Sequence, residues 1–124
     1  MSKYVLIRTD MSIELVDPAD YGIPDYMPEP QDYGPFLDMC YKLIGCDSIE
    51  HVFDCSYIYV VDECGALKED RVPNELLGFV LNYPYVIYGN AIACIRSGPD
   101  VFPLPDDEAV KVKETFEMLR EFLR

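Results

Sequence analysis

The chain has few basic residues. Ten Lys and Arg stand against 23 Asp and Glu, which gives a net charge of −13 at pH 7. Proteins that bind nucleic acid directly neutralise its phosphates with Lys and Arg. With so few basic residues, we do not expect this protein to bind nucleic acid directly. Attraction to an anionic membrane surface is disfavoured for the same reason. Any charged partner should therefore be basic.

Long apolar runs are also missing. No stretch approaches the roughly 18 consecutive apolar residues of a membrane-spanning helix, and no basic-then-apolar stretch with a small-residue cleavage site opens the chain. We therefore expect a cytoplasmic protein that does not enter a membrane. Its 124 residues, half of them hydrophobic, predict one folded domain over residues 1–124.

Motifs of common enzymes and metal sites are absent. The chain contains no Gly-rich phosphate loop, no GxSxG and no HExxH. Its single histidine, His51, has no evident partner for acid–base work, and Cys46, His51, Cys55 and Cys64 lack the paired spacing of structural zinc ligands. We expect no catalytic residue, metal or cofactor. The five cysteines, an odd number, are expected to be reduced and to pack as small hydrophobes.

The first half of the chain predicts short strands, a loop and a helix. Residues 3–8 and 11–16 indicate a hairpin that turns at Thr9 and Asp10. Residues 17–35 contain five of the ten prolines and predict an extended surface loop without regular structure. Residues 36–44 predict a helix capped by Gly45, and residues 48–53 and 57–61 predict strands, the second one central and buried on both faces.

The second half predicts turns, two helices and one long strand. A turn at residues 62–65 should place Gly65 in the left-handed region, before a returning segment at 66–68. Residues 72–82 predict a helix, 85–95 a strand interrupted at Gly89 and Asn90, and 97–105 a loop. The last helix should be capped by Asp106 and has one apolar stripe, formed by Ala109, Val112, Phe116, Leu119 and Leu123.

Together these elements predict an α+β fold with a mostly antiparallel sheet and about three helices, including a C-terminal amphipathic helix. The near-heptad spacing of that helix also permits a homodimer formed between two copies of it.

The negative charge is concentrated in one part of the sequence. Residues 10–67 hold thirteen acids and one base, Lys42, for a charge of −12. One interpretation is a solvated surface that keeps the protein soluble. The other is a negative face that binds a basic partner, such as a nucleic-acid-binding protein. The sequence leaves both open.

Three Asp-Tyr pairs, each followed by Pro two or three residues later, lie in the proline-rich segment. Tyr offers apolar area with a polar end and Asp supplies charge, so the segment is a candidate recognition loop. In the alternative interpretation the tyrosines fold back onto the body and anchor the loop. The candidate interaction residues are Asp20, Tyr21, Asp25, Tyr26, Glu29, Asp32 and Tyr33.

Two further hypotheses come from other residue groups. A small-ligand-binding or regulatory domain would use a pocket formed by Tyr57, Tyr59, Tyr85 and Tyr88. A hydrolase would use Asp62, Glu63, Asp106 and Asp107 to hold a divalent ion, although acids are common at turns and helix starts in any case.

Five segments carry a family resemblance: residues 43–50, 59–68, 73–74, 87–92 and 104–108. They resemble the domain-of-unknown-function family three-eight-four-six, small uncharacterised domains of phages and conjugative elements. Cys46 and Ser48 depart from the family pattern, and residues 17–35 look like an insertion. The resemblance implies an accessory protein of a mobile element and no particular activity. Combined with the charge, it favours a non-catalytic acidic protein that masks a basic partner, for example a DNA-binding host-defence protein.

Overall fold

A computed structural model describes residues 1–24, 33–54, 56–81, 86–98 and 100–123. Its centre is a seven-stranded sheet in which all described strand pairs are antiparallel. The strands are β1 (Ser2–Ile7), β2 (Ile13–Val16), β3 (Ile49–Phe53), β4 (Ile58–Asp62), β5 (Ala91–Ser97), β6 (Asp100–Phe102) and β7 (Leu104–Pro105). The helices are α1 (Gly34–Ile44), α2 (Glu75–Leu81) and α3 (Asp106–Leu123), with single 3-10 turns η1 (Pro18–Tyr21) and η2 (Gly65–Leu67). The predicted α+β class is confirmed.

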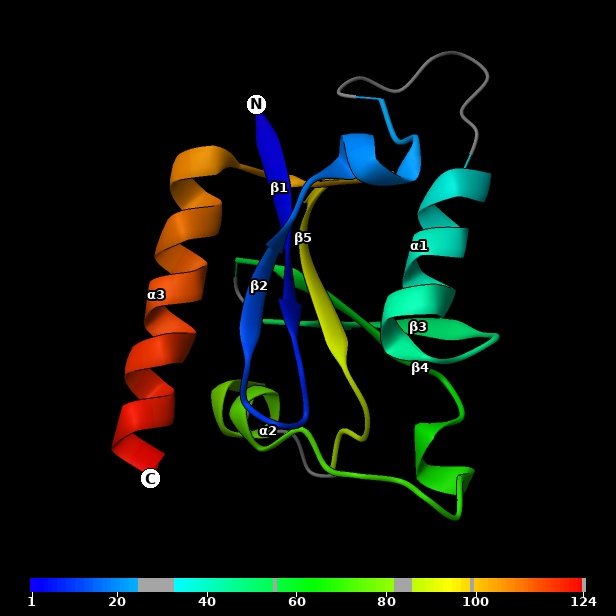
Figure 1. Ribbon diagram of the computed structural model, residues 1–124, viewed down its shortest axis with the longest axis vertical. Coiled ribbons are helices and arrows are strands. Elements are labelled where there is room, and N and C mark those ends of the chain that lie inside the picture. The colour runs from blue at the N-terminus through cyan, green and yellow to red at the C-terminus, as the bar shows by residue number, and fades with distance from the viewer. Residues whose placement is uncertain (25–32, 55, 82–85, 99, 124) are drawn as a thin grey trace.

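Helices cover both faces of the sheet, so the molecule has three layers. Figure 1 shows α3 and α2 on one side and α1 on the other. Strand β1 shows why: Val5 and Ile7 pack into the core on the α2–α3 side, whereas Tyr4 and Leu6 pack into the core on the α1 side. Successive side chains of a strand point to opposite faces, and a strand that is apolar at every position must be covered twice.

The strand order is β2-β1-β5-β4-β3, with β6 paired to β5 and β7 paired to β1. The predicted hairpin is confirmed, in a register that pairs Tyr4 with Val16 and Ile7 with Ile13. All five residues of β4 are buried, as predicted, but the middle position of the sheet belongs to β5. Among the described residues, no helix combines the length and apolar character needed to cross a membrane.

The prediction for residues 17–35 is wrong in part. A 3-10 turn forms at its start, where Asp17 caps the backbone N–H of Ala19 and Pro18 occupies the first turn. Helix α1 begins at Gly34, with Pro35 in its first turn. Proline is tolerated there because those N–H groups have no partner within the helix. Residues 25–32 lie outside the described part of the chain.

Gly65 corrects the predicted left-handed turn. It begins η2 with an ordinary φ, and no returning strand follows. A Cβ at this position would lie 3.0 Å from the carbonyl oxygen of Tyr88. The close approach of another backbone segment therefore favours glycine here, a reason that spacing along the sequence does not reveal.

The region before α3 also differs from the prediction. Strand β5 begins only at Ala91, because Gly89 has a φ of +90° and Tyr88 makes an isolated bridge to Pro73. Tyr85 lies outside the described residues. The predicted loop at 97–105 instead contains the short strands β6 and β7, whose prolines sit beside or at the end of a strand, as proline's missing N–H requires.

Helices α2 and α3 agree with the sequence pattern. The Asn74 side chain accepts a hydrogen bond from the backbone N–H of Leu77 at 3.1 Å and so caps α2. In α3 the predicted stripe is buried at Ala109, Val112 and Phe116 and partly buried at Leu119. Leu123, in the last turn, is 37% exposed.

Candidate functional site

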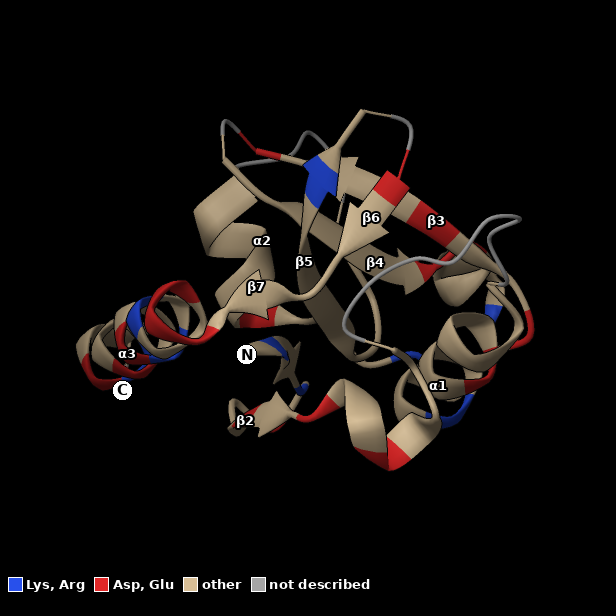
Figure 2. Ribbon diagram, turned by 90° about the horizontal axis from the view of Figure 1, so that it is seen from above, with Lys and Arg blue, Asp and Glu red and all other residues tan. Residues whose placement is uncertain are grey.

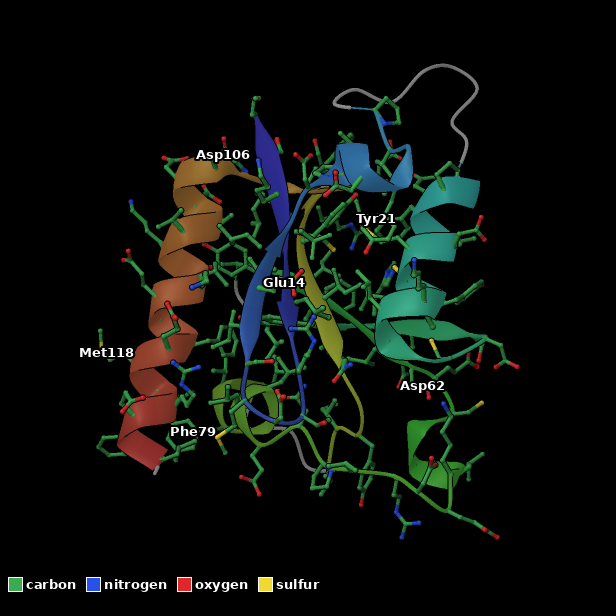
Figure 3. The ribbon with its side chains drawn as sticks, in the orientation of Figure 1. Glu14, Tyr21, Asp62, Phe79, Asp106 and Met118 are labelled. Atoms are coloured by element: carbon green, nitrogen blue, oxygen red, sulfur yellow. The ribbon has the colours of Figure 1, made fainter. Side chains whose placement is uncertain are left out.

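The described tyrosines of the candidate recognition loop lie against the body of the protein. Tyr21, on η1, packs against the α1-side core, and the Nζ of Lys42 lies 5.9 Å from its ring centroid (Figure 3). Tyr33, just before α1, has its ring centroid 6.5 Å from that of Phe36, and its hydroxyl donates to Asp100. Burial, and then this hydrogen bond, raises the pKa of Tyr33 to about 12. Tyr21 therefore anchors the start of the proline-rich segment, residues 17–35, and Tyr33 anchors its end.

Asp20 is exposed on η1. In the Asp20-Tyr21 pair the carboxylate therefore faces solvent, whereas the tyrosine ring packs against the core. The other candidate interaction residues, Asp25, Tyr26, Glu29 and Asp32, lie outside the described residues.

Tyr33 also lines a groove of about 490 Å³ beside the N-terminal half of α1. Strand β3 forms one wall and β6 another, so the groove joins two consecutive elements, α1 and β3, to a strand much later in the sequence. Its lining is Tyr33, Phe36, Leu37, Ile49, His51, Asp100 and Val101. The groove therefore combines two aromatic rings and aliphatic side chains with one carboxylate and one imidazole.

His51 lies in this groove because β3 alternates: Ile49 and His51 share the face towards α1, and Val52 points into the core on the other side. Burial, and then the nearby positive charge of Arg96, lowers the pKa of His51 below its ordinary value of 6.5. The imidazole is thus neutral at pH 7. The permanent charge among the groove residues is that of Asp100, and aromatic faces beside a carboxylate are a suitable environment for a cationic side chain.

Charge compensation differs between the two sides of the sheet. Five of the six ion pairs among the described residues lie within β1, β2, α3 and the turn after β1; they join Lys3 to Asp106, Arg8 to Glu14, Lys113 to Glu117, and Arg120 to both Glu117 and Glu121. On the side of α1, the exposed residues Asp20, Asp38 and Asp47 take part in none of these pairs. Figure 2 shows acids along α3 as well as on η1 and α1. On α3, three of the six acids are paired and three are not, whereas none of the three exposed acids on the side of α1 is paired.

The tyrosines proposed for a ligand pocket do not share one cavity. Tyr57 and Tyr59 line a cavity of about 170 Å³ beside α3, where the Tyr59 hydroxyl donates to Asp54 at 3.0 Å. Tyr59 is only 2% exposed, and its ring packs edge-on against Phe116. Tyr88 lines two other cavities and lies under Arg71, with 5.5 Å from the guanidinium carbon to the ring centroid.

The carboxylates proposed for a hydrolase lie at opposite ends of the molecule. Figure 3 shows Asp62 far from Asp106, and each is paired with a lysine: Asp62 with Lys68 at 2.7 Å, Asp106 with Lys3 at 3.2 Å. In the part of the chain that the structure describes, no three His, Cys, Asp or Glu side chains gather as a metal site would require. The geometry gives this hypothesis no reaction centre.

A polar cavity of about 220 Å³ near Asp62 was not expected from the sequence. Lys68 donates to the carbonyl oxygen of Gly45 at 2.9 Å as well as pairing with Asp62, and Asn90 joins Thr9 to the carbonyl oxygen of Leu43. Several of its lining residues belong to the segments that carry the family resemblance. Because its main polar groups are bonded to one another, we interpret the cavity as a structural junction of four loops.

Geometry and charge thus define an α+β protein in which three exposed acids, on η1, on α1 and just after α1, lie on the same side of the sheet as a mixed groove. Comparison with protein-family models, curated proteins and solved structures found no match for the chain. The resemblance to domain-of-unknown-function family three-eight-four-six accordingly stays a prediction.

Proposed function

We propose that this protein is a non-catalytic interaction protein that binds a basic protein partner through its α1 surface. The α1 surface comprises the exposed acids Asp20, Asp38 and Asp47 together with the groove lined by Tyr33, His51 and Asp100. The observation that carries the proposal is that Asp20, Asp38 and Asp47, exposed on the side of α1, take part in no ion pair among the described residues, whereas three of the six acids of α3 do.

Uncompensated acids act on a partner before contact. A surface of one sign steers an oppositely charged protein and raises its association rate, with an effect that decreases as salt screens the charges. Lys42 lies over the Tyr21 ring and is the only Lys or Arg between Arg8 and Lys68. A basic partner meets opposing charge here from Lys42 and from Arg96, which lies near His51.

The groove supplies contact after the encounter. An arginine side chain entering it would place its guanidinium near the Asp100 carboxylate and against the Tyr33 ring. A planar guanidinium suits both partners, since it binds carboxylates through parallel N–H groups and stacks on aromatic faces. This favours arginine over lysine at the contact.

Basic, arginine-rich surfaces are typical of proteins that bind nucleic acid. The partner we propose is therefore a nucleic-acid-binding protein whose binding surface would be masked in the complex. The family resemblance would place such a pair in the cytoplasm of a bacterium that carries a phage or conjugative element, with a host-defence protein as the target.

Titration of the protein with deca-arginine and deca-lysine tests the surface directly. We expect deca-arginine to bind more tightly, and both affinities to fall steeply between low and physiological salt. The variant Asp20→Asn/Asp38→Asn/Asp47→Asn should bind about tenfold more weakly. The control Asp107→Asn/Glu108→Gln/Glu114→Gln changes net charge equally but on α3, and should lose much less.

Equal losses in the two triple variants would show that net charge alone controls binding and would overturn the assignment to the α1 surface. A second assay tests masking: a basic DNA-binding domain held on duplex DNA should be released by the wild-type protein and retained by the α1-surface variant.

A further inference from the structure

The surface between α2 and α3 exposes large apolar side chains. Phe79 is 56% exposed, Met118 73% and Phe122 78%. Together with Val80, Thr115 and Leu119 they line a groove of about 410 Å³. Figure 3 labels Phe79 on α2 and Met118 on α3.

This groove adjoins the buried stripe of α3 and shares only Leu119 with it. Ala109, Val112 and Phe116 pack into the core. Thr115, Met118 and Phe122 form a second stripe, on the neighbouring face of the helix, that lines the groove. Their spacing of three and then four residues is the spacing of a helix–helix contact, in which side chains of one helix insert between those of another. α3 therefore has one apolar stripe that packs into its own core and a second one that stays largely exposed among the described residues.

The charge of the residues around this groove indicates which partner it can bind. The described residues 111–123 hold three bases and three acids, whereas residues 1–110 carry a charge of −14. Lys113 already pairs with Glu117 at 3.0 Å, and Arg120 pairs with Glu117 and Glu121. Two strongly acidic molecules repel one another at most orientations, but at this groove each presents balanced charge around an apolar centre. A basic partner gains no attraction here.

We infer that this groove is the interface of a homodimer, in which a second copy of the chain packs its own α2–α3 groove against the first. A two-fold axis makes such an interface self-complementary: the protruding Phe122 of each copy can fill the groove of the other. If the axis crosses α3 between Thr115 and Met118, Lys111 of each copy faces the Phe122 ring of the other, a favourable cation–aromatic contact.

The dimer also fits the proposed function without depending on it. The groove lies on the α2–α3 side of the sheet and the α1 surface on the opposite side. A dimer through α3 would therefore place its two acidic α1 surfaces on outer faces. Such an arrangement keeps the negative surfaces apart and leaves both able to bind.

Sedimentation equilibrium of the full chain under reducing conditions tests the inference. We expect the mass to rise with concentration towards twice the 14.2 kDa of one chain. Phe122→Glu and Met118→Glu should each raise the dissociation constant at least about tenfold. Both side chains are mostly exposed, so the monomer should keep its fold, which circular dichroism checks.

The matched control is Val110→Glu, the same charge change on the same helix at a side chain that is 41% exposed and lies outside the groove. It should dimerise as the wild type does. A wild-type chain that stays monomeric at about 200 µM, or equal dissociation of Val110→Glu and Phe122→Glu, would overturn the inference. The dimer should persist at about 0.5 M salt, where deca-arginine binding is lost, so the two proposals fail separately.

Discussion

The side-chain amide of Asn74 donates a hydrogen bond to the backbone carbonyl oxygen of Ile7 at 3.0 Å. This contact joins the start of α2 to the end of β1, across 67 positions of the sequence. Asn74 is 1% exposed, and its Nδ2 also donates to the carbonyl oxygen of Gly89 at 3.0 Å. With the N-cap bond to Leu77, one side chain fixes the position of three segments.

Asn74→Ala should therefore destabilise the protein by about 3 kcal/mol. Alanine removes the cap and leaves two carbonyl oxygens without this donor, and each buried polar group that loses its partner costs on the order of 1 kcal/mol or more. Urea denaturation measures the free energy of unfolding. Glu75→Gln, at the exposed neighbouring position, is the control and should change it by less than about 0.5 kcal/mol. A loss below about 1 kcal/mol in Asn74→Ala would contradict this account.

Two glycines should respond to alanine with opposite signs. Gly45 ends α1 with a φ of +80°, a conformation that costs an L-residue roughly 1 kcal/mol, so Gly45→Ala should destabilise by about that amount. Gly78 lies inside α2, where a Cβ meets nothing within 4 Å. Gly78→Ala should stabilise by about 0.5–1 kcal/mol through helix propensity. Thermal unfolding of both variants is the measurement, and shifts of the same sign would refute the reasoning.

The parts of the fold that sequence predicted well depend on local periodicity. The hairpin, α1 with its cap at Gly45, and the buried stripe of α3 repeat every two or every 3.6 residues, and burial selects that repeat. The errors concern non-local contacts. Gly65 is fixed by the backbone at Tyr88, and the strands β6 and β7 exist because β5 and β1 offer them edges.

The candidate site also has a part that the sequence pattern predicted and a part that depends on non-local contacts. Tyr33 was selected from the Asp-Tyr pattern, and the structure places it in the groove of the α1 surface. Its neighbours His51 and Asp100 could not be chosen with it, because they come together only when β3 pairs with β4 and β6 pairs with β5 in one sheet. The excess of acids in residues 10–67 could be counted in the sequence. Which acids are paired could not, because pairs such as Lys3 with Asp106 join residues 103 positions apart.

The stability of the protein should fall at mildly acidic pH because of His51. Its pKa in the folded state is lowered, first by burial and then by Arg96, so the unfolded state binds the proton more readily. The contribution of His51 is complete above the unfolded pKa near 6.5 and is lost as pH falls through and below it. Urea denaturation from about pH 8 to pH 5 should show a smaller decrease for His51→Gln than for the wild type. Parallel profiles would show that His51 titrates alike in both states.

The cysteines should differ widely in their reaction with iodoacetamide, because only a thiolate that reagent can reach is alkylated. Cys40 and Cys94 are both 0% exposed in the α1-side core. Burial raises the pKa of Cys94 to about 12 and raises that of Cys40 as well. Both should react only when the protein unfolds.

Cys64 is exposed and should be modified first, whereas Cys46 should react more slowly because partial burial and then the charge of Asp62 raise its pKa. Mass spectrometry of peptides at successive times separates the sites; Cys55 lies outside the described residues and serves no test. In urea above the unfolding midpoint, Cys40 and Cys94 should label as fast as Cys64, which controls for intrinsic reactivity. Fast labelling of Cys40 or Cys94 in the native protein would mean that α1 opens from the sheet far more often than global unfolding occurs, and the α1 surface would then have to be reconsidered as a mobile element.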